Sequence, residues 1–139
     1  MITFEVLGEP VAKGRPKFST RGGFAKAYTP AATRHAEGNF QSQAVQYAPK
    51  QPLDGPLALI VRVYRSKGMP KTKKGLEAAE RGAIRPITKP DGDNYLKLVC
   101  DSMNCIFWHD DAQVVDKSVS KYFSTRPRIE VELTEVNNF

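Results

Sequence analysis

The sequence contains few cysteines and histidines, and this scarcity excludes several kinds of site. Its only cysteines, Cys100 and Cys105, have a spacing that fits neither a CxxC redox pair nor a zinc site. Its only histidines, His35 and His109, are too few and too widely separated for a zinc site of the usual kind. We therefore expect reduced thiols in a cytosolic protein.

Long apolar runs are also missing. No stretch of the sequence approaches the ~20 apolar residues that a membrane-spanning helix needs, so no membrane partner is expected. Glu5 and Glu9 interrupt the apolar residues of the N-terminus, which is not the pattern of a secretory signal. The 139 residues contain no internal repeat or low-complexity segment. This length predicts a single domain, residues 1–139, with one hydrophobic core.

Acidic residues are scarce in the first part of the chain. Between Pro10 and Lys89 there are 16 Lys and Arg against 4 Asp and Glu, whereas the remaining residues hold 5 Lys and Arg against 11 Asp and Glu. The net charge of +6 therefore combines a basic majority with an acidic cluster. A metal-dependent nuclease needs both, because basic residues attract phosphates and carboxylates attract metal. A generically basic protein is the bland alternative, since charge alone predicts only non-specific attraction.

The acidic cluster centres on the motif Lys89-Pro90-Asp91-Gly92-Asp93-Asn94, followed later by His109-Asp110-Asp111. Proline biases the residues before it toward extended geometry, and Gly92 is expected to let the backbone bend between two aspartates. Asp93 is then expected to cap a helix that runs from about Asn94 to Cys105.

Helical spacing divides the residues of this expected helix between two faces. Polar residues at spacings of three and four share one face: Asn94, Lys97 and Asp101. Apolar residues form the expected core stripe on the opposite face: Leu96, Val99 and Met103. We therefore expect the chemistry on one side of the helix and the packing on the other.

Two carboxylate pairs and a lysine suit phosphodiester hydrolysis. Magnesium takes oxygen ligands, and crowded aspartates repel one another without a cation between them. Paired metals activate water and stabilise the leaving oxygen, and a lysine can offset charge in the transition state. In the bland alternative, Asp91 and Asp93 serve only as turn and cap residues, and Lys97 and Asp101 form a solvated pair. An EF-hand loop is excluded, because the glycine at its sixth position and its distal glutamate are missing.

The ordered combination of these motifs resembles the RusA family of Holliday junction resolvases. The matching residues are Lys89-Pro90-Asp91-Gly92-Asp93-Asn94-x-x-Lys97-x-x-x-Asp101 and then Trp108-x-Asp110-Asp111-Ala112-Gln113-Val114-Val115. The opening Gly8-x-Pro10-Val11-x-Lys13-Gly14-Arg15-Pro16-Lys17 and Tyr28-Thr29-Pro30 are also similar to that family. The resemblance extends over essentially the whole chain. Gly92, where the family often has an apolar residue, and Asn104-Cys105-Ile106, where a glycine-containing turn is common, depart from the pattern.

The resemblance implies a small homodimeric endonuclease of bacteria or their phages, acting in DNA recombination and repair. It implies four-way DNA junctions as the substrate and Mg²⁺ as the cofactor, with Mn²⁺ as a possible substitute. We expect Asp91, Asp93 and Asp111 to be both catalytic and metal ligands, and Asp110 to be a weaker ligand. Lys97 is the expected transition-state lysine, and Asp101 is expected to orient Lys97 or to contact water at the metal.

Eight basic residues are expected to contact the DNA backbone: Lys13, Arg15, Lys17, Arg21, Lys71, Lys73, Lys74 and Lys89. Such contacts carry no base information, so they also suit a rival function. That rival is a non-catalytic basic DNA-binding accessory protein. An Asp-x-Asp phosphatase is a second rival and fits poorly, because the stretch before Asp91 is short, charged and interrupted by Pro86.

The pattern of elements predicts an α+β fold with a mixed β-sheet packed by helices. Strands are expected at 1–7, 24–28, 57–64 and 114–123, and a last strand should bury Ile129, Val131 and Leu133 as the second arm of a C-terminal antiparallel hairpin. Residues 8–23 are expected to be loop. A helix over 30–48 should have Thr29 as its cap, Pro30 at its first position, and Phe40, Ala44 and Tyr47 toward the core. Residues 65–89 are expected to form a mobile basic segment around a short helix at 72–82.

The strand at 57–63 and the terminal hairpin are also expected to present more apolar faces than one small sheet needs. This expected surplus is the argument that the residues themselves offer for a homodimer.

Overall fold

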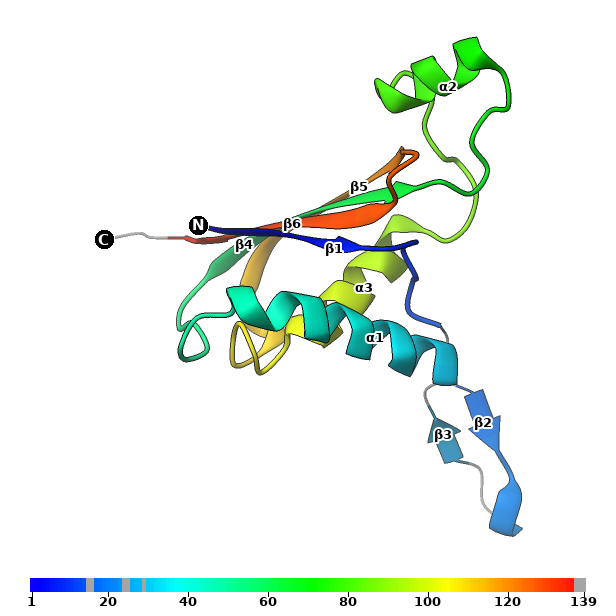
Figure 1. Cartoon of the computed structure of the whole chain (residues 1–139). Coiled ribbons are helices and arrows are strands. Elements are labelled where there is room, and N and C mark those ends of the chain that lie inside the picture. The colour runs from blue at the N-terminus through cyan, green and yellow to red at the C-terminus, as the bar shows by residue number, and fades with distance from the viewer. Residues whose placement is uncertain (15–16, 24–25, 29, 137–139) are drawn as a thin grey trace.

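The computed structural model describes residues 1–14, 17–23, 26–28 and 30–136. Strands β1 (Ile2–Leu7), β4 (Leu57–Arg65), β5 (Val114–Phe123) and β6 (Arg128–Glu135) form one mixed sheet in the order β1-β6-β4-β5. Helices α1 (Ala31–Ala44) and α3 (Gly92–Met103) cover one face of this sheet (Figure 1). The α+β class and the single mixed sheet predicted from the sequence are confirmed.

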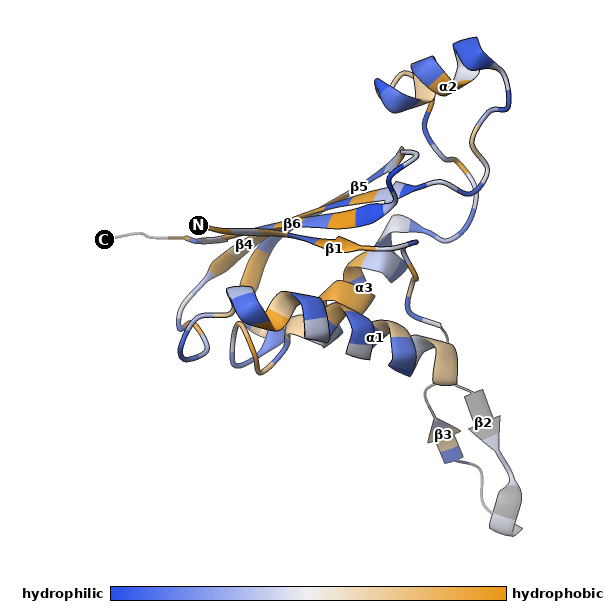
Figure 2. Ribbon diagram, viewed as in Figure 1, coloured by the Kyte–Doolittle hydropathy of each residue, from blue (hydrophilic) through white to orange (hydrophobic). Residues whose placement is uncertain are grey.

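Alternation along the strands produces the core. In β4, Leu57, Leu59, Val61 and Val63 are buried, and the register aligns the last three with the buried residues of β6, which are Leu133, Val131 and Ile129. This inner face of the sheet packs against α1 and α3, and Figure 2 shows apolar and polar residues alternating along the strands. Phe4 of β1 adds ring contacts with Phe40, Tyr47 and Phe107.

The predicted C-terminal hairpin is wrong. β4 lies between β5 and β6, pairing in parallel with β5 and antiparallel with β6. The short connection over 124–127 therefore passes the end of β4, where the Ser124 amide donates to the Arg65 carbonyl at 3.0 Å. Two strands joined by a short turn usually pair directly, but here each gains more buried contact beside the apolar central strand.

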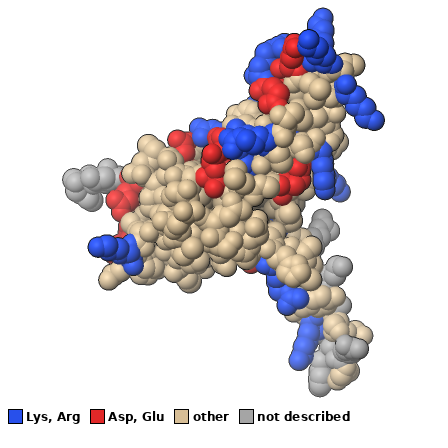
Figure 3. Space-filling model, in the orientation of Figure 1, with Lys and Arg blue, Asp and Glu red and all other residues tan. Residues whose placement is uncertain are grey.

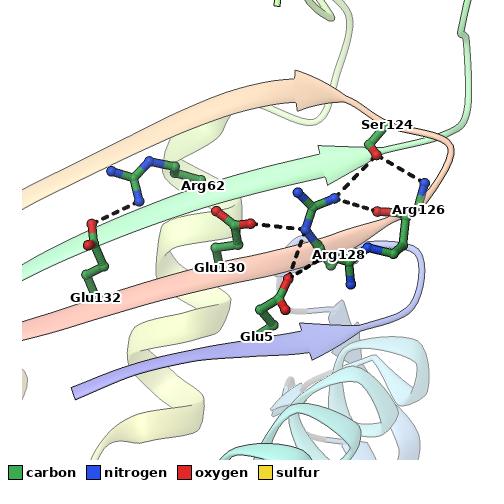
Figure 4. A network of polar contacts seen from close by, with 7 residues as sticks. All are labelled: Glu5, Arg62, Ser124, Arg126, Arg128, Glu130 and Glu132. Carbon is green, nitrogen blue, oxygen red and sulfur yellow. Dashed lines mark hydrogen bonds and ion pairs between the residues drawn. The ribbon is translucent and has the colours of Figure 1, made fainter. Parts of the chain in front are cut away.

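The opposite, open face of the sheet is polar. Arg62 pairs with Glu132 at 2.9 Å, and Arg128 contacts Glu130 and Glu5 at 3.1 and 3.0 Å (Figure 4). Leu57, Leu59, Val61 and Val63 are covered within the chain by α1 and α3, whereas Ile60 is exposed on the open face. The homodimer stays a prediction.

Two projections extend from this body. Strands β2 (Lys17–Ser19) and β3 (Lys26–Tyr28) form an antiparallel pair beyond the start of α1, so part of the expected 8–23 loop is a strand. Helix α2 (Lys73–Glu80), capped by Thr72, projects from the other side of the sheet (Figure 1). The Glu80 carboxylate accepts from the Thr125 amide at 2.5 Å, which ties α2 to the β5–β6 turn. The mobility of residues 65–89 stays a prediction.

Several helix ends differ from those predicted. The structure has Pro30 at the N-cap of α1 rather than inside the helix, and Thr29 lies outside the described residues. A 3₁₀ turn, η2 (Val45–Tyr47), follows α1. Phe40 and Ala44 are buried as expected, whereas Tyr47 is 44% exposed and contributes one ring face to the core by stacking on Phe4. No helix among the described residues is long and apolar enough to cross a bilayer.

Candidate active site

A cavity of about 320 Å³ lies between α3 and β5 and gathers most of the predicted site. From α3, residues at helical spacing line it: Asp93, Leu96, Lys97, Cys100 and Asp101. Asp111 enters it from the 3₁₀ turn η3 (Asp111–Gln113) that precedes β5, and Lys117 enters from β5 itself. The structure thus brings Asp93, Lys97 and Asp111 together, as the sequence predicted.

Helix α3 begins two residues earlier than predicted. Gly92 is its first residue, with Asp91 at the N-cap and Asp93 in the first turn. Because Gly92 has helical backbone, it is not a bend. A Cβ atom at Gly92 would lie 3.1 Å from Val119 Cγ1, so glycine instead lets the helix start close to β5.

The core stripe of α3 was predicted in part. Val99 and Met103 are buried as predicted, whereas Leu96 is only half-buried and lines the cavity, and Tyr95 and Leu98 are buried as well. Spacing alone left this choice open, because an amphipathic helix with apolar residues on more than one side can be turned either way.

The two aspartates of the first motif, Asp91 and Asp93, line different cavities. Within the described residues, the Asp91 side chain makes no capping hydrogen bond, so its carboxylate is not used to cap α3. Asp91 lines an adjoining cavity of about 790 Å³ together with Lys13, Lys89 and Asn94. Asp91 therefore does not line the cavity that Asp93 and Asp111 share.

Asp110 and Asp111 also take different roles. The Asp110 side chain accepts from the Ala112 amide at 2.9 Å and caps η3 in a capping box with Gln113. Asp111 Oδ1 instead accepts from the buried Trp108 Nε1 at 2.8 Å, which fixes the direction of its carboxylate. Asp111 thus lies at the cavity while Asp110 is used as a cap.

A β-bulge decides which residues of β5 face α3. Leu57 pairs with Val114 but Ala58 pairs with Asp116, so Val115 is an extra residue. Beyond the bulge, Lys117 aligns with Leu59 and Lys121 with Val63. The bulge thus turns both lysines toward α3, while Asp116 goes to the open face.

Lys121 holds the loop that carries Asp91. Its ammonium donates to the carbonyls of Thr88 and Pro90 at 2.9 and 3.0 Å. From β4, Arg65 donates to the Lys89 carbonyl at 3.0 Å and also bonds the Thr88 hydroxyl. Two cations on neighbouring strands therefore position the start of the acidic motif.

Asp101 is paired with Lys13. The Lys13 ammonium bonds Asp101 and lies 3.5 Å from Glu37, and these carboxylates, Asp101 first, raise the pKa of Lys13 against its partial burial. Its backbone amide also donates to the Asn94 carbonyl at 3.0 Å, which lays the N-terminal loop across α3. Asp101 was expected to orient Lys97, but in the structure it pairs with Lys13, which is one of the residues expected to contact DNA.

The other basic residues expected at the DNA lie on three parts of the chain. Lys71, Lys73 and Lys74 are exposed on the α2 projection, and Lys89 is exposed beside Asp91. Arg15 lies outside the described residues, and only the backbone is described for Lys17 and Arg21. Figure 3 shows Lys and Arg gathered over the α2 projection and along the one that carries β2 and β3.

The donor set fits a hard divalent cation. Among the described residues, no three His, Cys, Asp or Glu side chains are close enough to form a complete protein cage. Magnesium, however, takes only one or two protein carboxylates and keeps waters or substrate phosphates in its other positions. Asp93 and Asp111 at one cavity, with the carboxylate of Asp111 oriented by Trp108, provide that minimum.

Three residues at or beside the site were not predicted from the sequence: Lys117, Lys121 and Arg65. Lys117 and Lys121 are four positions apart on a strand, which places them on one face, and this signal was present in the sequence. The bulge decides whether this face points to α3 or to the open side of the sheet, and no local pattern marks Val115 as an extra residue. Arg65 ends an apolar strand, but its contacts with residues 88–89 are tertiary.

Comparison with known proteins adds two findings. The family described as Endodeoxyribonuclease RusA matches residues 8–134. A Bacillus subtilis (strain 168) protein, described as the uncharacterized protein YqaN, is 44% identical over 138 residues, which cover 98% of this chain and 97% of that protein.

Lys121→Met should loosen the loop before Asp91, because two charge-assisted hydrogen bonds to its carbonyls disappear. We expect the free energy of unfolding to fall by about 1–2 kcal/mol and the Lys89 and Asp91 amides to exchange faster with deuterium. Lys50→Met removes the same charge at an exposed position outside the site. Equal exchange at Lys89 and Asp91 in both variants would show that Lys121 does not hold the loop.

Proposed function

This chain belongs to the RusA family of endodeoxyribonucleases, and we propose from that premise that it resolves four-way (Holliday) DNA junctions. The proposed reaction is structure-selective, Mg²⁺-dependent hydrolysis of phosphodiesters by paired symmetric cuts, in recombination and repair. The observation that carries it is the shared cavity of Asp93, Lys97 and Asp111. We infer a cytoplasmic site of action, and a phage or prophage origin agrees with the family resemblance.

The proposed cofactor is Mg²⁺, with Mn²⁺ as a substitute, held by Asp93 and Asp111 and reached by Asp91 from the adjoining cavity. When bound, it supplies Lewis-acid activation of water and of the phosphodiester. The chain's own residues then position these groups. Trp108 directs the Asp111 carboxylate, and Lys121 with Arg65 holds the loop that ends at Asp91. Lys97, on the helix wall of the cavity, offsets negative charge that develops on the phosphate.

The capping of Asp110 and the lack of a capping bond at Asp91 bear on the non-catalytic alternative. If the aspartates were only helix caps, the carboxylate at the N-cap of α3 would be used as one, and it is not. Of the four predicted ligands, Asp110 alone has a side chain that caps a turn or helix among the described residues. We therefore assign Asp110 no direct role with metal and favour an enzyme over an accessory DNA-binding protein.

The first test replaces each carboxylate. Asp91→Asn, Asp93→Asn and Asp111→Asn should each abolish Mg²⁺-dependent cleavage of a four-way junction, because each removes a negative charge that a hard cation needs. Lys97→Ala should slow cleavage on the order of 10²-fold without weakening metal affinity. The measurement is single-turnover cleavage at saturating enzyme, with gel-shift binding in Ca²⁺ to show that the junction is still bound.

Asp116→Asn is the matched control for this series. The bulge turns Asp116 to the open face, where it pairs with Ala58, so this variant should cleave at nearly the parent rate. Normal cleavage by all three carboxylate variants would support the accessory-protein alternative, and loss of cleavage only in Asp116→Asn would move the active site to the open face.

The second test concerns the exposed lysines of the α2 projection. Neutralising Lys71, Lys73 and Lys74 together should weaken DNA binding similarly for all sequences, since phosphate contacts carry no base information. The slope of log K against log salt should become shallower by about 0.9 for each phosphate that the variant no longer neutralises. An unchanged slope would remove the α2 projection from the DNA interface.

The third test concerns assembly. We propose a homodimer because two symmetric strands of a junction call for two active sites related by a two-fold axis. Sedimentation at micromolar concentration should then give twice the 15.5 kDa mass of the chain. A monomer that still makes paired cuts would reject this arrangement.

A further inference from the structure

Lys117 is a second cation at the active-site cavity, and none of the predicted roles includes it. It lies on the β5 wall, whereas Lys97 lies on the α3 wall of the same space. Its position follows from the bulge at Val115, which aligns Lys117 with the buried Leu59 instead of sending it to the open face. The chain thus places two ammonium groups on two walls of a cavity that also holds Asp93 and Asp111.

Two nearby lysines are already engaged within the chain, but Lys117, like Lys97 on the α3 wall, is not. Lys13 is engaged by Asp101, and Lys121 by two loop carbonyls. The Lys117 side chain forms no hydrogen bond or ion pair with any other described residue, and it is exposed. An ammonium beside carboxylates but bonded to none of them is available to a ligand with negative charge.

The environment of Cys100 also indicates that Lys117 lies at this cavity, near Asp111. This thiol also lines the cavity, and burial raises its pKa to about 11. The charges that act on it are those of Lys117, which lowers the pKa, and of Asp111 and Asp101, which raise it. Cys100 and Leu96 make part of the cavity lining apolar, and charges interact more strongly beside apolar groups than in open water.

We propose that Lys117 is a catalytic residue that contacts the phosphodiester in the cavity and stabilises the charge that develops on it. This inference rests on the proposed function. A phosphodiester gains negative charge on its oxygens as it is attacked, so a fixed cation there lowers the barrier. Lys117 keeps its proton throughout and takes no part in making or breaking bonds. Its positive charge also opposes metal binding by Asp93 and Asp111, so the same residue raises the rate and lowers metal affinity.

The sharpest test moves the lysine by one residue. The double variant Lys117→Ser/Ser118→Lys keeps the composition and the net charge but places the ammonium on the open face of β5. Lys117→Gln is the second variant, because it keeps most of the aliphatic stem at this exposed edge position. Both variants should cleave the junction at least about 10-fold more slowly in single turnover at saturating enzyme. The double variant, which keeps the net charge, should bind the junction in Ca²⁺ as the parent does. A double variant that cleaves at the parent rate would overturn the proposal, since charge near the DNA would then suffice.

A metal titration provides a readout that a merely structural role would not change. Mn²⁺ binding, followed by calorimetry without DNA, should become about two- to tenfold tighter in both variants, because a positive charge beside the carboxylates is gone. Unchanged Mn²⁺ affinity in both variants would overturn the placement of Lys117 at the metal ligands. If the parent itself cut no junction, the proposed function would fail, and the Mn²⁺ titration would still decide the position of Lys117.

Discussion

The contact between the first turn of α3 and strand β5 is the constraint on which the site depends. Glycine at position 92 eases this approach, because a Cβ there would lie 3.1 Å from Val119 Cγ1 and the valine side chain would have to shift by a few tenths of an ångström. The approach brings the polar stripe of α3 beside the β5 edge of the sheet, and buried residues such as Tyr95 and Val99 hold the helix on the inner face. The position of the candidate site is therefore set by apolar packing, which is strong and non-directional.

The acidic cluster is tolerated because most of its charges have a defined partner. Lys13 bonds Asp101, Trp108 donates to Asp111, and the backbone of η3 uses Asp110. The carboxylates of Asp91 and Asp93 have no such partner among the described residues and lie at the start of a helix whose dipole favours negative charge. The hydrogen bonds therefore separate Asp110, which caps a turn, from Asp111, whose carboxylate is oriented by Trp108 and still lines the cavity.

Local patterns predicted the elements well. The alternation at 57–64 and 129–133 predicted β4 and β6, because a period of two depends only on neighbouring residues, and β5 was also expected at 114–123. The pairing of those strands was predicted wrongly, because the insertion of β4 between β5 and β6 depends on contacts distant in sequence. The N-cap of α3 was misplaced by two residues, since both Asp91 and Asp93 are good cap residues and only packing chose between them.

By itself, the sequence determined the class of fold, the buried faces of β4 and β6, the family, and the order of the two acidic motifs along the chain. Those properties depend only on residue types and their spacing along the chain. Only the tertiary structure decided that Asp111 lies at the cavity while Asp110 caps a turn, that Lys121 and Arg65 hold the loop before Asp91, and that Lys117 faces α3. The last of these depends on one extra residue in β5, because a shift of one position in a strand sends every following side chain to the other face of the sheet.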